Sequence, residues 1–142
     1  MKRKGSAHWS GDLRTGKGTI STESGALSAI PYGFATRFGD QKGSNPEEII
    51  GAAHAACFSM ALSAELAKAH IVAQSIDTTS TVELAQAAGG GFEIPAVHLT
   101  VTVSAPGADK AAVETATNTA KANCPVSKLL KATITMDATY NT

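Results

Sequence analysis

Large side chains and charge are both scarce in this sequence of 142 residues. Only 5% of the residues are aromatic, and charged residues make up 17%, below the roughly 25% of an ordinary soluble domain. The 12 basic residues balance the 12 acidic ones, so the chain has no net charge to attract nucleic acid or an anionic lipid surface. We therefore expect no nucleic-acid partner and no membrane association.

Long apolar runs are missing as well. The basic residues at positions 2–4 precede no apolar segment, so the N-terminus lacks the pattern of a secretory signal. No stretch approaches the roughly 18 apolar residues that a membrane span requires. These features favour a cytoplasmic protein.

Alanine takes the place of larger side chains, with 26 copies in the chain. Small side chains bury little apolar area, and burial stabilises a fold by roughly 25 cal/mol per Å². A chain of this size would therefore have a thin core if it stood alone. A second subunit can supply the missing area, so we expect a homodimer, the commonest closed assembly.

Changes in hydrophobic periodicity predict a single α+β domain over residues 1–142. Helices are predicted over residues 46–69, 109–122 and 125–131. Strands are predicted over residues 4–9, 16–23, 32–38, 76–84, 94–104 and 134–140. The fourth and fifth of these would form a hairpin around a glycine turn at residues 89–91. Antiparallel sheets at both ends of the chain would then pack around the long central helix.

The helix over residues 46–69 has the best-defined start. Asn45 is expected as its N-cap, Pro46 occupies the first helical position, and Glu48 follows three residues after the cap. Apolar residues that recur every three or four positions predict one broad buried face. These residues are Ile49, Ile50, Ala53, Ala56, Cys57, Met60, Ala61, Ala64 and Ala67.

The two cysteines, Cys57 and Cys124, allow two interpretations. In a reducing compartment they are either inert buried thiols or a transient redox pair. Cys124 precedes Pro125 at a predicted helix N-terminus, where free N–H groups lower the pKa of a thiol. Cys57 lies within an apolar helix face, where desolvation raises its pKa. A reactive Cys57 would therefore need a cationic partner.

Arg37 is the candidate for that cation. It alternates with apolar neighbours in the strand predicted over residues 32–38, although a solvated arginine is the commoner situation. Glu47, in the first turn of the long helix, could equally serve only to complement the helix dipole. By themselves these two residues do not decide between the interpretations.

Several segments carry a family resemblance. The main ones are residues 44–48, 51–62 and 122–127, and residues 7–9 and 31–38 add to them. They resemble the signature segments of the OsmC/Ohr family of organic hydroperoxide reductases, in its OsmC branch. A glutamate ten residues before the first cysteine and a Cys-Pro pair at the second are specific features, and the resemblance covers nearly the whole chain.

The resemblance implies a thiol peroxidase that uses no metal, haem or other cofactor. Cys57 would attack the O–O bond of an organic hydroperoxide and become a sulfenic acid, and Cys124 would condense with it to a disulfide. Arg37 would stabilise the Cys57 thiolate and orient the peroxide, while Glu47 would hold Arg37 in place. The resemblance also implies an intertwined homodimer, reduction by dihydrolipoyl groups, and a role in defence against oxidative and osmotic stress.

Helix geometry constrains how these residues could meet. Ten residues separate Glu47 from Cys57, which is about 15 Å along one helix, so the two cannot meet within it. Either Arg37 spans the gap, or Arg37 and Glu47 act on the cysteine of the partner subunit. We favour the second arrangement, with active sites at the dimer interface. A thiol among aliphatic side chains also favours alkyl and fatty-acid hydroperoxides over hydrogen peroxide.

Two other functions remain open. His54 and Cys57 could bind Zn²⁺ together with Cys124 and either His70 or His98, but their spacing matches no compact zinc motif. His54 is more simply interpreted as a packed or hydrogen-bonded helix residue. The second alternative is a non-catalytic, stress-related binding dimer whose cysteines are structural.

Overall fold

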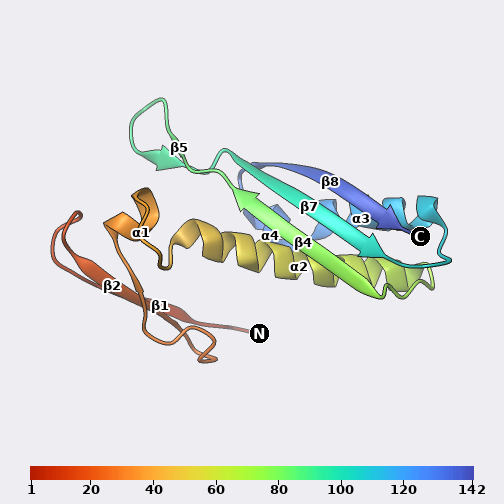
Figure 1. The fold of residues 1–142 in the computed structure, drawn as a ribbon, viewed down its shortest axis with the longest axis horizontal. Helices are drawn as coiled ribbons and strands as arrows, with labels where there is room; N and C mark the ends of the chain where they lie inside the picture. The colour runs from red at the N-terminus through yellow and green to blue at the C-terminus, as the bar shows by residue number, and fades with distance from the viewer. The chain divides into compact units, whose positions relative to one another are not determined.

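The computed structural model describes residues 1–142, which form two compact units, Met1–Ile49 and Ile50–Thr142. Each unit has a three-stranded sheet of its own, and the second unit also contains most of the helices (Figure 1). The mixture of helices and sheets confirms the α+β class. That the whole chain acts as one domain stays a prediction.

The first unit is built on a small antiparallel sheet. Its strands are β1 (Gly5–Ser10), β2 (Lys17–Thr22) and β3 (Ile30–Tyr32), paired in that order. The rings of Trp9 and Tyr32 lie 5.5 Å apart between centroids, and both approach the Cα of a glycine at position 18 in β2. A larger residue there would collide with both rings, which is why this strand carries a glycine. The positions of β1 and β2 confirm the first two predicted strands.

The strand predicted over residues 32–38 is wrong beyond its first residue, because α1 (Phe34–Phe38) is a short helix. The Thr36 hydroxyl accepts a hydrogen bond from the N–H of Gly33 and donates one to its carbonyl, at 2.9 and 3.0 Å. These local bonds close a helical turn. The aromatic rings at its two ends pack at 4.9 Å between centroids. Alternation in the sequence indicates a strand, but these short-range contacts produce a helix.

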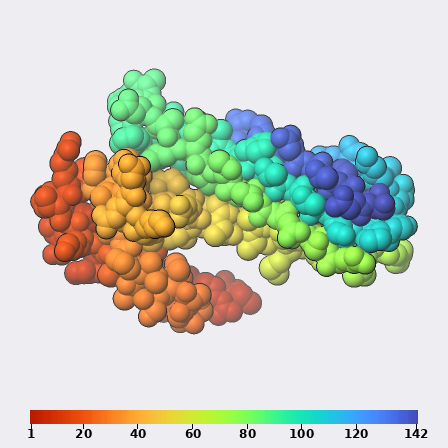
Figure 2. Space-filling view, viewed as in Figure 1, coloured from red at the N-terminus to blue at the C-terminus, as the bar shows by residue number.

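The second unit contains a sheet ordered β4-β7-β8, from β4 (Ser75–Val82), β7 (Ala96–Ser104) and β8 (Thr133–Asn141). β4 and β7 pair antiparallel along their length, so the predicted hairpin is confirmed. A smaller hairpin of β5 (Ala85–Gln86) and β6 (Phe92–Glu93) extends its turn. This small hairpin projects from the end of β4 and β7 in the space-filling view (Figure 2).

The sheet of the second unit is mixed, because β8 runs parallel to β7. In this detail the expectation of antiparallel sheets at both ends of the chain is wrong. The connection from β7 to β8 passes through α3 (Lys110–Asn123) and α4 (Pro125–Leu129). A helical crossover returns the chain to the end of the sheet where β7 began, and the next strand then runs parallel to it.

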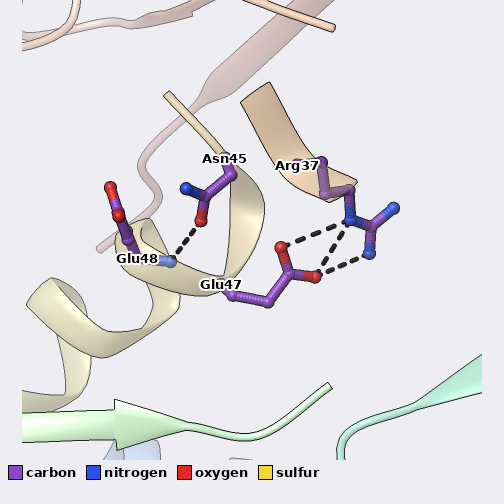
Figure 3. Close-up of polar contacts among 4 residues, drawn as sticks. All are labelled: Arg37, Asn45, Glu47 and Glu48. Carbon is purple, nitrogen blue, oxygen red and sulfur yellow. Dashed lines mark hydrogen bonds and ion pairs between the residues drawn. The ribbon is translucent and has the colours of Figure 1, made fainter. Parts of the chain in front are cut away.

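The long helix α2 (Pro46–Lys68) starts where the sequence predicts. The side-chain oxygen of Asn45 accepts a hydrogen bond of 2.8 Å from the N–H of Glu48, which satisfies one of the free donors at the helix start (Figure 3). The boundary between the two units falls inside this helix, after Ile49.

The packed face of α2 agrees with the predicted one only in part, because Cys57 and Ala61 pack against the core but lie at its margin. Its bulky side chains Phe58, Leu62 and Leu66 are buried against β7 and α3. Bulky side chains bury more apolar area per residue, and so they decide which side of the helix faces the sheet. The side chains of the predicted face that are exposed in the single chain are Ala53, Ala56, Met60, Ala64 and Ala67.

Helix α2 is also long and apolar enough to resemble a membrane span, with a mean hydropathy of 1.4 over its most apolar part. The expectation that no stretch approaches the length and hydropathy of a membrane span is therefore wrong. Its bulky face packs on the sheet of the second unit, as the core helix of a soluble protein does. Length and composition alone therefore do not make it a membrane segment.

Candidate active site

The structure brings Cys57 and Cys124 together in the second unit. Cys57 lies in the middle of α2, and Cys124 occupies the N-cap position of α4. Both are free thiols that pack in the same core, and each shifts the pKa of the other. Cys124 is fully buried, whereas Cys57 is only half-buried. The half-buried thiol is thus the one that a substrate could reach.

The surroundings of the two sulfur atoms make their acidities differ. Burial raises the pKa of Cys57, and its contact with Cys124 raises it further. Burial also opposes ionisation of Cys124, but the N–H of Ser127, the Cys57 thiol and the Ser127 hydroxyl outweigh it and lower the Cys124 pKa. Within this unit Cys124 is the more acidic thiol. Cys57 therefore needs a positive charge from elsewhere in order to ionise, as the sequence suggests.

Arg37 and Glu47 form an ion pair in the first unit. The guanidinium Nη2 donates to Oε1 of Glu47 at 2.7 Å, and Nε donates to Oε1 and Oε2 at 3.1 and 3.3 Å. Figure 3 shows the other terminal nitrogen of Arg37 directed away from the carboxylate. The Arg37 side chain is 36% exposed and that of Glu47 is 13% exposed. A forked pair of this kind fixes the plane of the guanidinium and leaves one edge free to donate.

The elements that hold this pair differ in one respect from the prediction. Arg37 projects from helix α1 rather than from a strand, and its guanidinium lies 5.2 Å from the centroid of the Phe38 ring. Glu47 lies in the first turn of α2, as expected. The four predicted site residues thus form two pairs, one in each unit. That both pairs serve one site stays a prediction.

A buried polar cluster beside the cysteines includes residues that the sequence analysis does not single out. His54 is fully buried, and its Nε2 lies 2.8 Å from the Ser127 hydroxyl. Its Nδ1 lies 3.3 Å from the Ser80 hydroxyl. The expectation that His54 is a hydrogen-bonded helix residue is confirmed. The signal for Ser127 is its place one helical turn after Cys124, but only the fold brings Ser80 to the same histidine.

The remaining candidates for a zinc site do not join this cluster. His98, on β7, pairs with Thr135 at 2.7 Å and with Asp137 at 3.4 Å, both on β8. His70 is exposed in the turn that follows α2. No group of three or more potential side-chain ligands comes together in residues 1–142.

Comparison with known proteins places the chain in a family. Residues 39–139 match the family model of OsmC-like proteins. The chain belongs to the OsmC-like family. Over 137 residues it is 55% identical to Peroxiredoxin OsmC of Escherichia coli (strain K12), a match that covers 96% of this chain and 95% of the relative. Peroxiredoxin OsmC of Shigella flexneri matches with the same values.

Solved structures of the OsmC-like family share this fold. The organic hydroperoxide resistance protein OhrB of Bacillus subtilis has a TM-score of 0.75 at 25% identity, over 99% of this chain and 98% of that one. An OsmC-like protein of unknown function from Vibrio cholerae has a TM-score of 0.77 at 16% identity, over 98% and 99% of the two chains. The second likeness bears on the fold alone. Together they confirm the OsmC-like fold of the single chain, and the intertwined homodimer stays a prediction.

Proposed function

We propose that this OsmC-like protein reduces organic hydroperoxides to alcohols through Cys57 and Cys124. Its 55% identity to Peroxiredoxin OsmC, across nearly all of both chains, identifies it as a peroxidase. OhrB, named for organic hydroperoxide resistance, supports the choice of substrate class. The observation that carries the proposal is the contact between a half-buried free thiol and a fully buried one.

The oxidative half of the proposed reaction has two steps. The Cys57 thiolate attacks one peroxide oxygen, the O–O bond breaks, and the alkoxide takes a proton and leaves as an alcohol. Cys57 is then a sulfenic acid. The Cys124 thiolate attacks its sulfur, the S–O bond breaks, and the oxygen leaves as water after taking a proton. The resulting Cys57–Cys124 disulfide protects Cys57 from further oxidation.

Arg37 is proposed to supply the positive charge that Cys57 requires. Burial works against the Cys57 thiolate, and a guanidinium remains charged at any working pH. Glu47 binds one edge of that guanidinium and leaves the other for the thiolate or the peroxide oxygen. The bidentate contact supports the holding role proposed for Glu47.

The exposed alanine-rich face of α2 supports a homodimer. Its members, Ala53, Ala56, Met60, Ala64 and Ala67, recur every three or four residues and remain uncovered in the single chain. A second copy could cover them and so add the buried apolar area that the composition leaves small in a single chain. We propose an intertwined homodimer with its active sites at the interface.

The substrate, reductant and location follow from the same proposal. Cys57 packs against the apolar core of the second unit, which favours alkyl and fatty-acid hydroperoxides over hydrogen peroxide. The proposed chemistry needs no metal or prosthetic group. Each turnover leaves a disulfide that an external dithiol must reduce, and we propose dihydrolipoyl groups for this step. The proposed setting is the bacterial cytoplasm during oxidative and osmotic stress.

Thiol titration tests this function against a non-catalytic binding dimer with structural cysteines. One equivalent of cumene hydroperoxide should consume two thiols per chain. The Cys57→Ser variant should keep its remaining thiol under the same conditions, which controls for direct oxidation of Cys124. If the unmodified protein retains both thiols, the binding dimer becomes the better account.

A further inference from the structure

A row of polar groups leads from the half-buried Ser80, on the sheet of the second unit, to the buried Cys124. The Ser80 hydroxyl on β4 lies 3.3 Å from Nδ1 of His54 on α2, and Nε2 of His54 lies 2.8 Å from the Ser127 hydroxyl on α4. Ser127 follows Cys124 by three residues at the start of α4, and its hydroxyl is one of the groups that lower the Cys124 pKa. His54 and Cys124 are fully buried, and Ser127 is 8% exposed. Three separate elements therefore contribute to a hydrogen-bonded row from Ser80 through His54 to Ser127, which ends beside Cys124.

The direction of this chain depends on the proton of His54. Burial lowers the pKa of His54, so the ring is neutral, with one nitrogen as donor and the other as acceptor. If Nε2 carries the proton, it donates a hydrogen bond to the Ser127 oxygen. The Ser127 hydroxyl is then free to donate a hydrogen bond to the Cys124 sulfur. In the opposite tautomer, the Ser127 proton is directed to His54, and the sulfur loses this donor. A buried Cys124 thiolate favours the first arrangement, because it can only accept.

We propose that His54 and Ser127 form a donor chain that stabilises the Cys124 thiolate for its attack on the Cys57 sulfenic acid. The inference rests on the proposed function and assigns the residues that govern its second step. In that step the new S–S bond forms as the S–O bond of Cys57 breaks, and the departing hydroxide takes a proton to become water. His54 and Ser127 are positioning residues, because neither exchanges electrons with the reacting atoms.

Besides the Ser127 hydroxyl, only a few groups affect the ionisation of Cys124. They are the Cys57 thiol from α2 and, from α4, the N–H groups of Val126 and Ser127. The N–H groups belong to the backbone, so no side-chain substitution removes them, and Cys57 is the reaction partner. The Ser127 hydroxyl is therefore the side-chain donor through which the ionisation of Cys124 can be changed experimentally.

A single-turnover experiment separates the two oxidative steps. Reduced protein is mixed with one equivalent of cumene hydroperoxide, and peroxide loss and disulfide formation are followed separately. Ser127→Ala and His54→Leu should consume peroxide at nearly the normal rate. Both should form the disulfide about tenfold more slowly, because each weakens a hydrogen bond to a charged group, and sulfenic acid should accumulate.

Two further variants control for a merely structural effect. Gln places an N–H close to where Nε2 of His54 lies, so His54→Gln should restore much of the rate that His54→Leu loses. Thr117→Val removes another fully buried hydroxyl, one that bonds only within its own helix α3, and should leave both steps unchanged. The inference is overturned if Ser127→Ala forms the disulfide as fast as Thr117→Val.

A second readout does not depend on peroxidase activity. In a Cys57→Ser background, the ultraviolet absorbance of the thiolate gives the pKa of Cys124 directly. Ser127→Ala should raise this pKa by about one unit, because the anion loses one strong donor, and Thr117→Val should not change it. An unchanged pKa in Ser127→Ala contradicts the inference. Failure of the unmodified protein to consume peroxide would instead contradict the proposed function.

Discussion

Cys57 and Cys124 have opposite electrostatic surroundings although they pack in the same core. Burial raises the pKa of Cys57, whereas donors from the start of α4 lower that of Cys124. A thiol peroxidase needs Cys57 as the anion in its first step. We propose that Arg37 supplies this charge, so its removal is the most informative change to a single residue.

Arg37→Ala should raise the Cys57 pKa and slow the peroxide step at neutral pH. An opposite charge close to an acid commonly lowers its pKa by about 1–3 units, so a rate loss of about tenfold or more is expected. Because the thiolate reacts, the rate should rise with pH, and the midpoint of that rise should move upward in the variant. Stopped-flow measurement of cumene hydroperoxide loss over a pH series gives both quantities.

Arg14→Ala is the matched control, because Arg14 also lies over an aromatic ring of the first unit, at 5.5 Å from the Phe34 centroid, and has no proposed role. It should leave the rate and its pH midpoint unchanged. If Arg37→Ala retains the full rate and the same midpoint, the arginine has no part in the mechanism.

Cys124→Ser should separate the first oxidation from its resolution. Peroxide should still be consumed once, but the Cys57 sulfenic acid should persist and react with dimedone. Turnover with an external dithiol should fall, and a second equivalent of peroxide should over-oxidise Cys57. Mass spectrometry of the dimedone adduct measures the trapped fraction. Normal steady-state turnover in this variant would argue against a resolving role for Cys124.

Helix α2 has two faces with different surroundings. Its bulky face holds the core of the second unit together, and its alanine-rich face is exposed in the single chain. Phe58 is fully buried, so Phe58→Ala should lower the free energy of unfolding by about 3–5 kcal/mol. Urea denaturation measures this change.

Ser63→Ala is the control within the same helix. Ser63 is exposed, so its substitution should alter stability by no more than about 0.5 kcal/mol. Equal losses in the two variants would mean that Phe58 does not lie in the core.

Local sequence patterns predict most helices and strands. They fail where tertiary packing or the path of the chain determines the element's type, direction or buried face. The cap at Asn45 and the alternation in β7 depend only on neighbouring residues, and both appear as expected. Thr36 closes the turn of α1 through bonds to Gly33 that alternation does not detect. The direction of β8 depends on the whole crossover through α3 and α4. Periodicity in α2 detects apolar positions but does not rank two competing faces.

The candidate site shows the same division. The specific motif residues Cys57, Cys124, Arg37 and Glu47 can be selected from the sequence, because their spacing resembles a known pattern. The partners of His54 cannot, since Ser80 reaches it from a distant strand. Tertiary structure is required to reveal hydrogen bonds between elements far apart in the chain.

At the scale of the whole molecule, the exposed face of α2 predicts assembly. The unmodified protein should sediment as a dimer at micromolar concentration. Ala64→Glu places a charge on that face and should shift the protein toward the monomer, because an unpaired charge is costly to bury. Thr100→Glu adds the same charge to the exposed face of the sheet in the second unit and should leave the dimer intact. A protein that is already monomeric without substitution would refute the proposed assembly.

Peroxide reduction by Cys57 and Cys124 is tested most directly by the intact mass of the reduced protein after one equivalent of an organic hydroperoxide. We expect each chain to lose the mass of two hydrogen atoms and to gain no oxygen. Treatment with a dithiol should restore the original mass and both alkylatable thiols. An unchanged mass with both thiols still free would contradict the assignment of Cys57 and Cys124 to peroxide reduction.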